Sequence, residues 1–242
     1  MPISVQNISF NIDSWLAHSN GFSQSQDWDN WAISLQWPEE TKLITSAIPP
    51  MMRRRMSNLS KLAVQTAIEL LSEHQVDYLV FASRHGELQR SAALIKDIIQ
   101  GEEASPMAFA QSVHNTAAGL ATIATKKPIP LTSISAAENT FQSAILEAWL
   151  YLSDNPDHKV LVIDFDEPLP EPYTTFETQD YRGYGLGLVL SSGHQFAVSF
   201  SDNTEYHQAT LPQGLEFVRQ YLSNKRDWMI ESPRQLGSWT RS

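Results

Sequence analysis

The sequence predicts an α/β fold with a mixed sheet, because short apolar strands alternate along it with segments of helical periodicity. Residues 129–135 and 160–165 are short, apolar and β-branched, which is typical of buried strands. Between them, residues 141–152 repeat apolar side chains at helical spacing, and the opposite face is apolar as well. A helix that is apolar nearly all round is expected to be buried. We therefore predict a strand that runs into a central helix.

The elements before this centre follow from the same patterns. Ser57 is in position to cap a helix, and residues 59–70 repeat apolar side chains as an amphipathic helix does. Residues 11–38 contain four tryptophans and are expected to form a loop or short helices. The other expected elements are a first strand at 3–10, a strand at 78–82, a helix at 88–99, and a segment at 106–124 that is helical in parts and interrupted by Gly119.

The elements after the centre begin with a glycine string, Gly183, Gly185 and Gly187. The string precedes a strand, whereas a dinucleotide site needs glycines between a strand and a helix, so close backbone packing in the sheet is the favoured interpretation. Residues 188–190 and 196–200 are expected to form a hairpin that turns at Ser192-Gly193. A last helix is predicted at 213–221, followed by a polar tail at 224–242.

Composition excludes several classes of function. The chain has 242 residues, of which 42% are hydrophobic and 18% charged, so it can form a packed core. It contains no cysteine, which excludes disulfides, thiolate metal sites and a cysteine nucleophile. The net charge of −10 disfavours a general nucleic-acid or anionic-membrane partner. We see neither a signal peptide nor a stretch of ~20 apolar residues, so a cytoplasmic protein without a membrane span is expected.

Polar residues that stand out have ordinary structural explanations as alternatives. His85 and His114 have no ligand-type neighbour at metal-binding spacing, so we predict no metal and structural roles for both. Asp164 and Asp166 follow the apolar run at a strand end, where α/β proteins place their sites, yet a solvated loop is the favoured interpretation. Residues 53–55 are three arginines, expected to be a solvated helix entry, with an acidic partner as the alternative.

Five stretches resemble the N-terminal half of β-ketoacyl synthases in order and spacing. They are PPMMRRRMSNLSKLAVQTA at 49–67, SPMAFAQSVHNTAAGLATIA at 105–124, AAENTFQSAILEA at 136–148, KVLVIDFDEP at 159–168 and GYGLGLVLSS at 183–192. The third stretch is similar to the nucleophile elbow of that family, whose pattern is roughly TACxxxxHAIxxA. The resemblance covers most of residues 1–200.

The resemblance implies a thiolase-like α/β fold that corresponds to the N-terminal half only. In this fold, α-β-α layers hold a mixed five-stranded sheet and the buried central helix. A single domain over residues 1–242 is expected, with its core at about 1–200 and a C-terminal helix and tail at 201–242.

Two departures from the family concern catalysis. Aligned on Ala144 and Ala148, the synthase cysteine falls on Glu138, and a carboxylate cannot hold an acyl chain as a thioester. The two catalytic histidines of the family belong to a C-terminal half for which this chain is too short. The resemblance is therefore best to chain length factors, the non-catalytic partners of complete synthases, although those usually have glutamine at the lost cysteine. Short proteins of this type resemble subunits of aryl polyene biosynthesis.

The implied function is a non-catalytic subunit that forms a heterodimer with a complete β-ketoacyl synthase and shapes its acyl tunnel. An acyl carrier protein would dock through the partner, and no cofactor is implied. Strand 129–135 would pair across the dimer, and a half fold would leave one layer uncovered, so the isolated chain is expected to be poorly soluble. The tunnel and interface candidates are Glu138, Phe141, Asn115, His114, Ile129, Leu131 and Ile134.

Other interpretations of the same residues remain open. Phe141 fits the apolar stripe of the central helix, so it is either an ordinary core residue or part of the tunnel floor. A carboxylate before a helix, such as Glu138, is favoured by the helix dipole alone. If Glu138 were buried, it could instead act as a base, for example in decarboxylating a malonyl group, and the chain would be an enzyme. A free-standing acyl-binding or scaffold protein is the third class.

Overall fold

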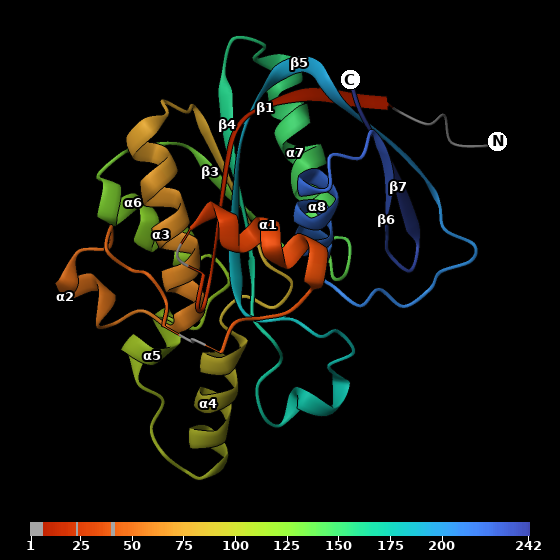
Figure 1. The fold of residues 1–242 in the computed structure, drawn as a ribbon. Coiled ribbons are helices and arrows are strands. Elements are labelled where there is room, and N and C mark those ends of the chain that lie inside the picture. The colour runs from red at the N-terminus through yellow and green to blue at the C-terminus, as the bar shows by residue number, and fades with distance from the viewer. Residues whose placement is uncertain (1–6, 23, 40–41) are drawn as a thin grey trace.

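The computed structural model describes residues 7–22, 24–39 and 42–242, in which a seven-stranded mixed sheet forms the centre (Figure 1). The strands are β1 (Asn7–Ser19), β2 (Tyr78–Ala82), β3 (Leu131–Ile134), β4 (Lys159–Asp166), β5 (Tyr184–Asp202), β6 (Asp227–Glu231) and β7 (Gln235–Arg241). Strands β3, β2 and β4 are parallel neighbours. The antiparallel strands β5, β7 and β6 continue the sheet, and β1 pairs with β5. The predicted count of five strands is wrong, because the C-terminal segment adds β6 and β7.

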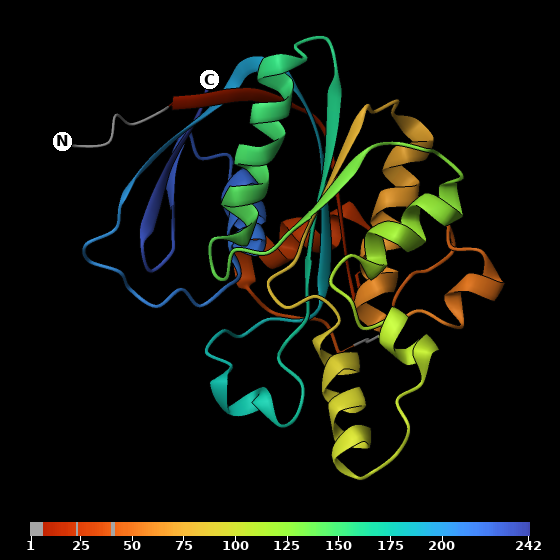
Figure 2. The same ribbon diagram turned by 180° about the vertical axis from the view of Figure 1, so that it is seen from behind.

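Helices cover both faces of the sheet, which confirms the expected α-β-α layers (Figures 1 and 2). On one face, α3 (Asn58–Glu73) packs on β4 and β5, and α6 (Thr116–Thr125) packs on α3. On the other face, α7 (Thr140–Asp154) and α8 (Gln213–Leu222) pack together, and α1 (Ser25–Ser34) contacts α8. The helices α2 (Pro50–Arg53), α4 (Leu88–Ile99) and α5 (Pro106–Ala110) and the 3-10 helix Tyr173–Phe176 lie outside these layers.

Helix α3 confirms two local expectations. The Ser57 hydroxyl accepts a hydrogen bond of 2.9 Å from the backbone N–H of Ser60, so Ser57 is the N-cap of this helix. The glycine string lies in β5 directly beneath α3. A Cβ atom on Gly185 would stand 2.8 Å from the carbonyl oxygen of Leu62, and one on Gly187 would stand 2.3 Å from Leu70. The glycines therefore allow close packing of helix on sheet, as the sequence indicated.

Strands β1 and β5 are longer than predicted, and the expected hairpin at Ser192-Gly193 is wrong. Strand β5 continues through this point, and its residues 184–191 and 196–199 pair with β1, with register shifts between Phe10 and Asn11 and between Ile12 and Ser14. The Asn11 amide donates a hydrogen bond of 3.2 Å to the carbonyl of Ser192 and accepts one of 3.1 Å from the backbone of Gln195. Asn11 thus bridges a bulge in β5 where a turn was expected. Residues 3–6 of the predicted first strand lie outside the described residues.

The C-terminal segment is a β-hairpin, so the prediction of a polar tail is wrong. Burial alternates along β6, and Trp228, Ile230 and Trp239 are all buried. Strand β7 pairs with the second half of β5, whereas β4 pairs with its first half. The sheet therefore continues around the helices, and β6 and β7 lie on the far side of α7 and α8 from β4 (Figures 1 and 2).

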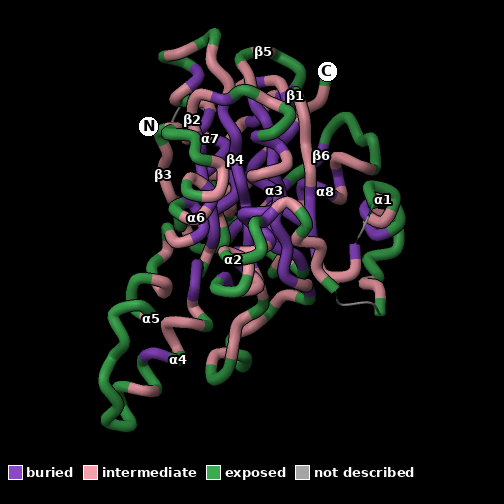
Figure 3. The backbone as a smooth tube through the Cα atoms, turned by 90° about the vertical axis from the view of Figure 1, so that its left-hand side faces the viewer, coloured by how far each residue is buried: buried purple, intermediate pink, exposed green. Residues whose placement is uncertain are grey.

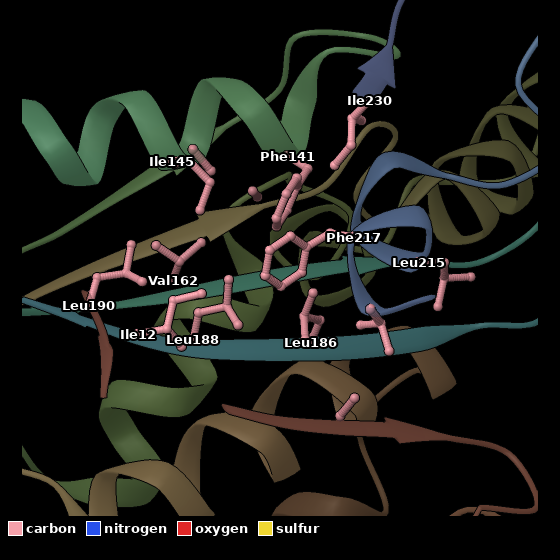
Figure 4. Packing of buried hydrophobic residues seen from close by; sticks show 14 of the residues in the cluster. Ile12, Phe141, Ile145, Val162, Leu186, Leu188, Leu190, Leu215, Phe217 and Ile230 are labelled. Carbon is pink, nitrogen blue, oxygen red and sulfur yellow. The ribbon is translucent and has the colours of Figure 1, made fainter. Parts of the chain in front are cut away.

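The central helix α7 is buried on one side and partly open on the other. Phe141, Ala144, Ile145 and Ala148 are buried as predicted. The first turn is covered on both sides, because Phe141 packs against Phe217 of α8 as well as against the hairpin (Figure 4). Three apolar residues toward the C-terminal end, Leu146, Trp149 and Tyr151, are only half-buried, and Leu150 is 49% exposed. The expected uncovered layer is thus limited to the C-terminal part of this helix.

The break in the segment 106–124 lies at residues 111–115, and Gly119 is inside α6, so the predicted interruption at Gly119 is wrong. Helix α6 is short and begins after Asn115. The helix predicted at 88–99 and the strand predicted at 78–82 are confirmed, and the helix predicted at 213–221 ends one residue later.

Candidate functional site

The parallel strands β2, β3 and β4 end at the same edge of the sheet, where Glu138 lies in the loop after β3 and His114 contacts Ser83 in the loop after β2. The ends of parallel strands are where open α/β sheets place their sites. Strand β3 enters α7 through a tight elbow at residues 135–139. The Thr140 hydroxyl closes this elbow, because it accepts a hydrogen bond of 2.9 Å from the backbone of Ala136 and donates one of 2.7 Å to the carbonyl of Ala137.

The elbow holds its backbone in an unusual conformation and presents Glu138 to solvent. Ala137 has a φ of 50°, in the left-handed region that non-glycine residues seldom adopt. Glu138 follows it, is exposed, and makes no side-chain hydrogen bond or ion pair within the described chain. The alternative in which Glu138 acts as a base required a buried carboxylate. This arrangement fits a carboxylate near the N-terminus of α7 and does not supply the surroundings of a base.

His114 joins the loop after β2 to strand β3. Its Nε2 lies 2.8 Å from the carbonyl oxygen of Ser83 after β2, and its Nδ1 lies 2.9 Å from the hydroxyl of Ser133 in β3. Because a carbonyl can only accept, Nε2 donates, and Nδ1 accepts from the Ser133 hydroxyl. Gly86 lies against the imidazole, since a Cβ atom there would stand 2.9 Å from the ring. These contacts favour the structural interpretation of His114, whereas Asn115 beside it is exposed.

Asp166 lies in a buried ionic network, so the predicted solvated loop is wrong. Its carboxylate accepts hydrogen bonds from the Ser83 hydroxyl at 2.9 Å and from the backbone of Arg84 at 3.0 Å. The Arg84 guanidinium forms an ion pair with it at 3.3 Å and also donates to Gln179 and to the Tyr181 hydroxyl. Burial raises the pKa of Asp166, and the charge of Arg84 opposes that shift.

Asp164 is buried beside this network without a basic partner in hydrogen-bonding contact. The Tyr184 hydroxyl donates a hydrogen bond of 2.7 Å to it. Burial, with a smaller contribution from the charge of Asp166, raises the pKa of Asp164 to about 8. The carboxyl also touches the start of α8, because a Cβ atom on Gly214 would stand 2.0 Å from Oδ2. Asp164 thus connects the sheet to the C-terminal segment. Sequence reasoning noted this position but misjudged its burial.

Strand β3 forms one end of the sheet and pairs only with β2 among the described strands. Leu131 and Ile134 within it, and Ile129 just before it, are half-buried. Exposed apolar side chains lie on neighbouring elements, with Ile123 of α6 64% exposed and Val113 38% exposed. The predicted interface residues are therefore accessible, and the unpaired edge of β3 is available for another strand.

Phe141 lies in a different environment from the other candidates. It is 2% exposed, with ring centroids 5.2 Å from Phe217 and 6.0 Å from Trp239 (Figure 4). A buried amide network continues from this point, in which Gln142 binds Asn139 and the hairpin, and Asn139 binds Gln235 at 2.7 Å. The geometry favours the core interpretation of Phe141. The amide network had no signal in the sequence, since its members are far apart in the chain.

The described residues contain no group of three or more His, Cys, Asp or Glu side chains that could hold a metal ion. Among the same residues, no helix combines the length and the apolar character that crossing a bilayer requires.

The chain is similar to known proteins both in sequence, through a family model, and in structure. The family model "Beta-ketoacyl synthase, N-terminal domain" matches residues 28–240. A chain from the structure of the ketosynthase ApeO in complex with its chain length factor ApeC, from Xenorhabdus doucetiae, is 32% identical with a TM-score of 0.88, and the match covers 97% of this chain and 100% of that one. A comparison with curated protein sequences found no match.

Two more distant structures share the fold. A chain of the ishigamide ketosynthase/chain length factor is 14% identical with a TM-score of 0.62, over 82% of this chain and 68% of that one. A chain of AntDE:AntF, a type II polyketide acyl carrier protein in complex with its ketosynthase, is 11% identical with a TM-score of 0.68, over 98% of this chain and 100% of that one. These matches confirm the ketosynthase-type, thiolase-like fold.

Proposed function

Since this chain belongs to the β-ketoacyl synthase family through its N-terminal domain, we propose that it is a chain length factor, the non-catalytic subunit of a heterodimer with a complete β-ketoacyl synthase. The observation that carries the proposal is the elbow. It keeps a strand, a tight turn with a left-handed residue and a central helix, while Glu138 stands where the resemblance puts the cysteine. The chain contains no cysteine to replace it.

The unpaired edge of β3 supports a heterodimer. An apolar edge strand invites pairing with another chain, and proteins normally cover or blunt such edges. Leu131 and Ile134 are half-buried on this strand, with Ile129 immediately before it. The relative that is 32% identical along its full length was solved in complex with a ketosynthase, which supports the same class of partner for this chain.

We assign the acyl chain to the partner's tunnel, with elbow residues of this subunit at its wall. Glu138 and Asn115 are exposed in loops next to β3, and His114 fixes the loop that carries Asn115 to β3 and to the loop after β2. The resemblance indicates a polyketide- or fatty-acid-like product of the aryl polyene class, made in the cytoplasm. In this scheme the acyl carrier protein docks on the partner synthase. The role of this chain requires no cofactor.

Co-expression with a complete ketosynthase from the same genome tests the proposal. We expect the two chains to co-elute from a tagged synthase and to elongate carrier-bound acyl chains, and we expect E138Q to keep this activity. Replacing the partner's nucleophilic cysteine with alanine should abolish it. If Glu138 were a general base, E138Q would lower the rate by ~10²–10⁴-fold. Failure of the chains to associate, or loss of activity in an intact E138Q complex, would overturn the proposal.

A further inference from the structure

Helices α4 and α5 form an arm, defined as residues 88–113, that carries a dense group of exposed apolar side chains. Six of the thirteen large apolar side chains that are exposed in the described chain lie between residues 95 and 113. Ile99 is 79% exposed, Phe109 62% and Met107 60%, and the other three are Ile95, Ile98 and Val113. An apolar cluster of this density on a folded protein marks an interaction surface.

The arm contributes little to the core of this chain. Leu94 is the only buried residue of α4, although the helix has a strongly apolar face. A groove of about 880 Å³ separates α4 from the loop at 170–173, and Ile95, Ile99 and Tyr173 are among the residues that line it. The arm projects from the body of the molecule, and much of it is exposed (Figure 3). Its apolar face therefore needs a cover that the described chain does not supply.

The arm lies on the same flank of the molecule as the free edge of the sheet, with β3, α6, α5 and α4 following one another along that side (Figure 3). His114 fixes the end of the arm to β3 through the hydroxyl of Ser133, at 2.9 Å. Val113, which precedes it, is exposed. A partner that pairs with β3 would thus also contact the end of the arm, because both lie on the same side of the molecule.

We propose that the arm is a second contact region for the partner ketosynthase, continuous with the edge of β3. This inference rests on the proposed function and deepens it, because it assigns the partner a two-part surface. One part binds by strand addition at β3, and the other buries the apolar face of α4 and α5 in an apolar concavity of the synthase.

Two observations favour a ketosynthase over a second copy of this chain. The chain has a net charge of −10, and the turn after α4 carries Glu102 and Glu103, both exposed, so two copies would bring like charges together. A relative matched over its full length was solved with a ketosynthase. The aromatic rings of Phe141 and Phe217 are covered by the hairpin β6–β7, whereas the edge of β3 and the arm are not covered within the described chain.

The test compares F109D with M229D in the complex with the ketosynthase. Both side chains are 62% exposed, and Met229 lies on β6, at the opposite end of the sheet from β3. The dissociation constant is measured on the co-purified complex, which is diluted in steps while mass photometry follows the fraction that stays assembled. We expect F109D to weaken binding by ten-fold or more, which is the effect of an interface residue that contributes substantially to the binding energy. We expect the affinity of M229D to stay within two-fold of wild type. Ile99→Asp, at the most exposed large apolar side chain of the arm, serves as a second variant.

The outcomes separate the inference from the function on which it rests. If the wild-type chain does not bind the synthase, the proposed function fails. If it binds and both arm variants bind within two-fold of wild type, the partner does not use the arm and the inference fails alone. Thermal melting of each variant identifies a folding defect, and if F109D melts early, I99D decides. If the wild-type chain forms a dimer by itself that F109D dissociates, the arm belongs to a second copy and the inference is overturned.

Discussion

At the scale of single residues, Asp164 is the most unusual group in the chain. It is buried against Tyr184 and the first turn of α8, and within the described part of the chain no basic side chain forms a hydrogen bond or an ion pair with it. Its neighbour Asp166 differs, because Arg84 provides both an ion pair and a backbone hydrogen bond. Burial of the two carboxyl groups is therefore tolerated for different reasons: Asp164 stays protonated, and Asp166 pairs with a cation.

Asp164 should make stability fall as pH rises. Its pKa is about 8 in the folded chain, above the ordinary value near 3.8, so the unfolded chain loses the proton first. The stabilisation is fully present below about pH 4 and is lost progressively up to about pH 8. We expect D164N, which cannot ionise, to gain in melting temperature relative to wild type between pH 5 and pH 8. D157N, at an exposed position, is the control, and an unchanged difference between D164N and wild type would contradict the assignment.

Phe141 should behave as a core residue. Truncation to alanine removes its contacts with Phe217 and Trp239, and large-to-small changes of this kind cost about 3–5 kcal/mol. For a chain of this size that lowers the melting temperature by roughly 6–20 °C. We expect F141A to reduce the yield of complex, and L150A, on the exposed side of the same helix, to change it little. Longer products from an F141A complex of normal yield, measured by mass spectrometry, would show a tunnel floor instead.

At the scale of elements, the hairpin β6–β7 covers the first turn of α7, which a half fold was expected to leave open. Trp239 stacks on Trp228 with centroids 5.9 Å apart and closes over Phe141 and Phe217. The hairpin is tied down through Gln142, whose side chain donates to the carbonyl of Ile230 at 3.4 Å. The C-terminal segment therefore completes the cover over the first turn of α7 and over α8.

Removing Trp239 from the hairpin should lower the stability of the chain more than removing any single contact at the elbow does. We expect W239A to cost about 3–5 kcal/mol, because the indole is 1% exposed and borders four other aromatic rings. Urea unfolding followed by circular dichroism would measure the loss. Trp15 is half-buried at the edge of the same cluster, so W15A should cost clearly less. Equal effects of the two substitutions would show that the hairpin is not an essential layer.

At the scale of the whole molecule, the open surface is concentrated on one flank. The aromatic side of α7 and α8 is closed, whereas the edge of β3, the exposed part of α6 and the arm are not. The isolated chain is therefore expected to be poorly soluble because of a smaller exposed apolar surface than a whole uncovered layer. That surface consists of an apolar strand edge and an apolar arm, the kinds of surface that associate when their partner is missing.

The sequence by itself determined the order and type of most elements around the centre. Periodicity identified the strand before the elbow, the helix after it, the helix at 88–99 and the strand at 78–82, because those signals are local and repeat within one segment. The absence of cysteine settled that no cysteine nucleophile stands at the elbow. The apolar stripe of α7 also indicated which of its residues enter the core.

Only the tertiary structure decided what depends on partners far apart in the chain. Asn11 turns an expected hairpin into a continuous strand through contacts with residues 192 and 195. Burial of Asp166 is tolerated because Arg84, 82 residues away, donates to it. The hairpin β6–β7 has the composition of a polar tail, since its buried side chains Trp228, Ile230 and Trp239 stand among exposed or half-buried residues that are mostly polar. Such outcomes follow from the pairing of distant segments, which local composition does not encode.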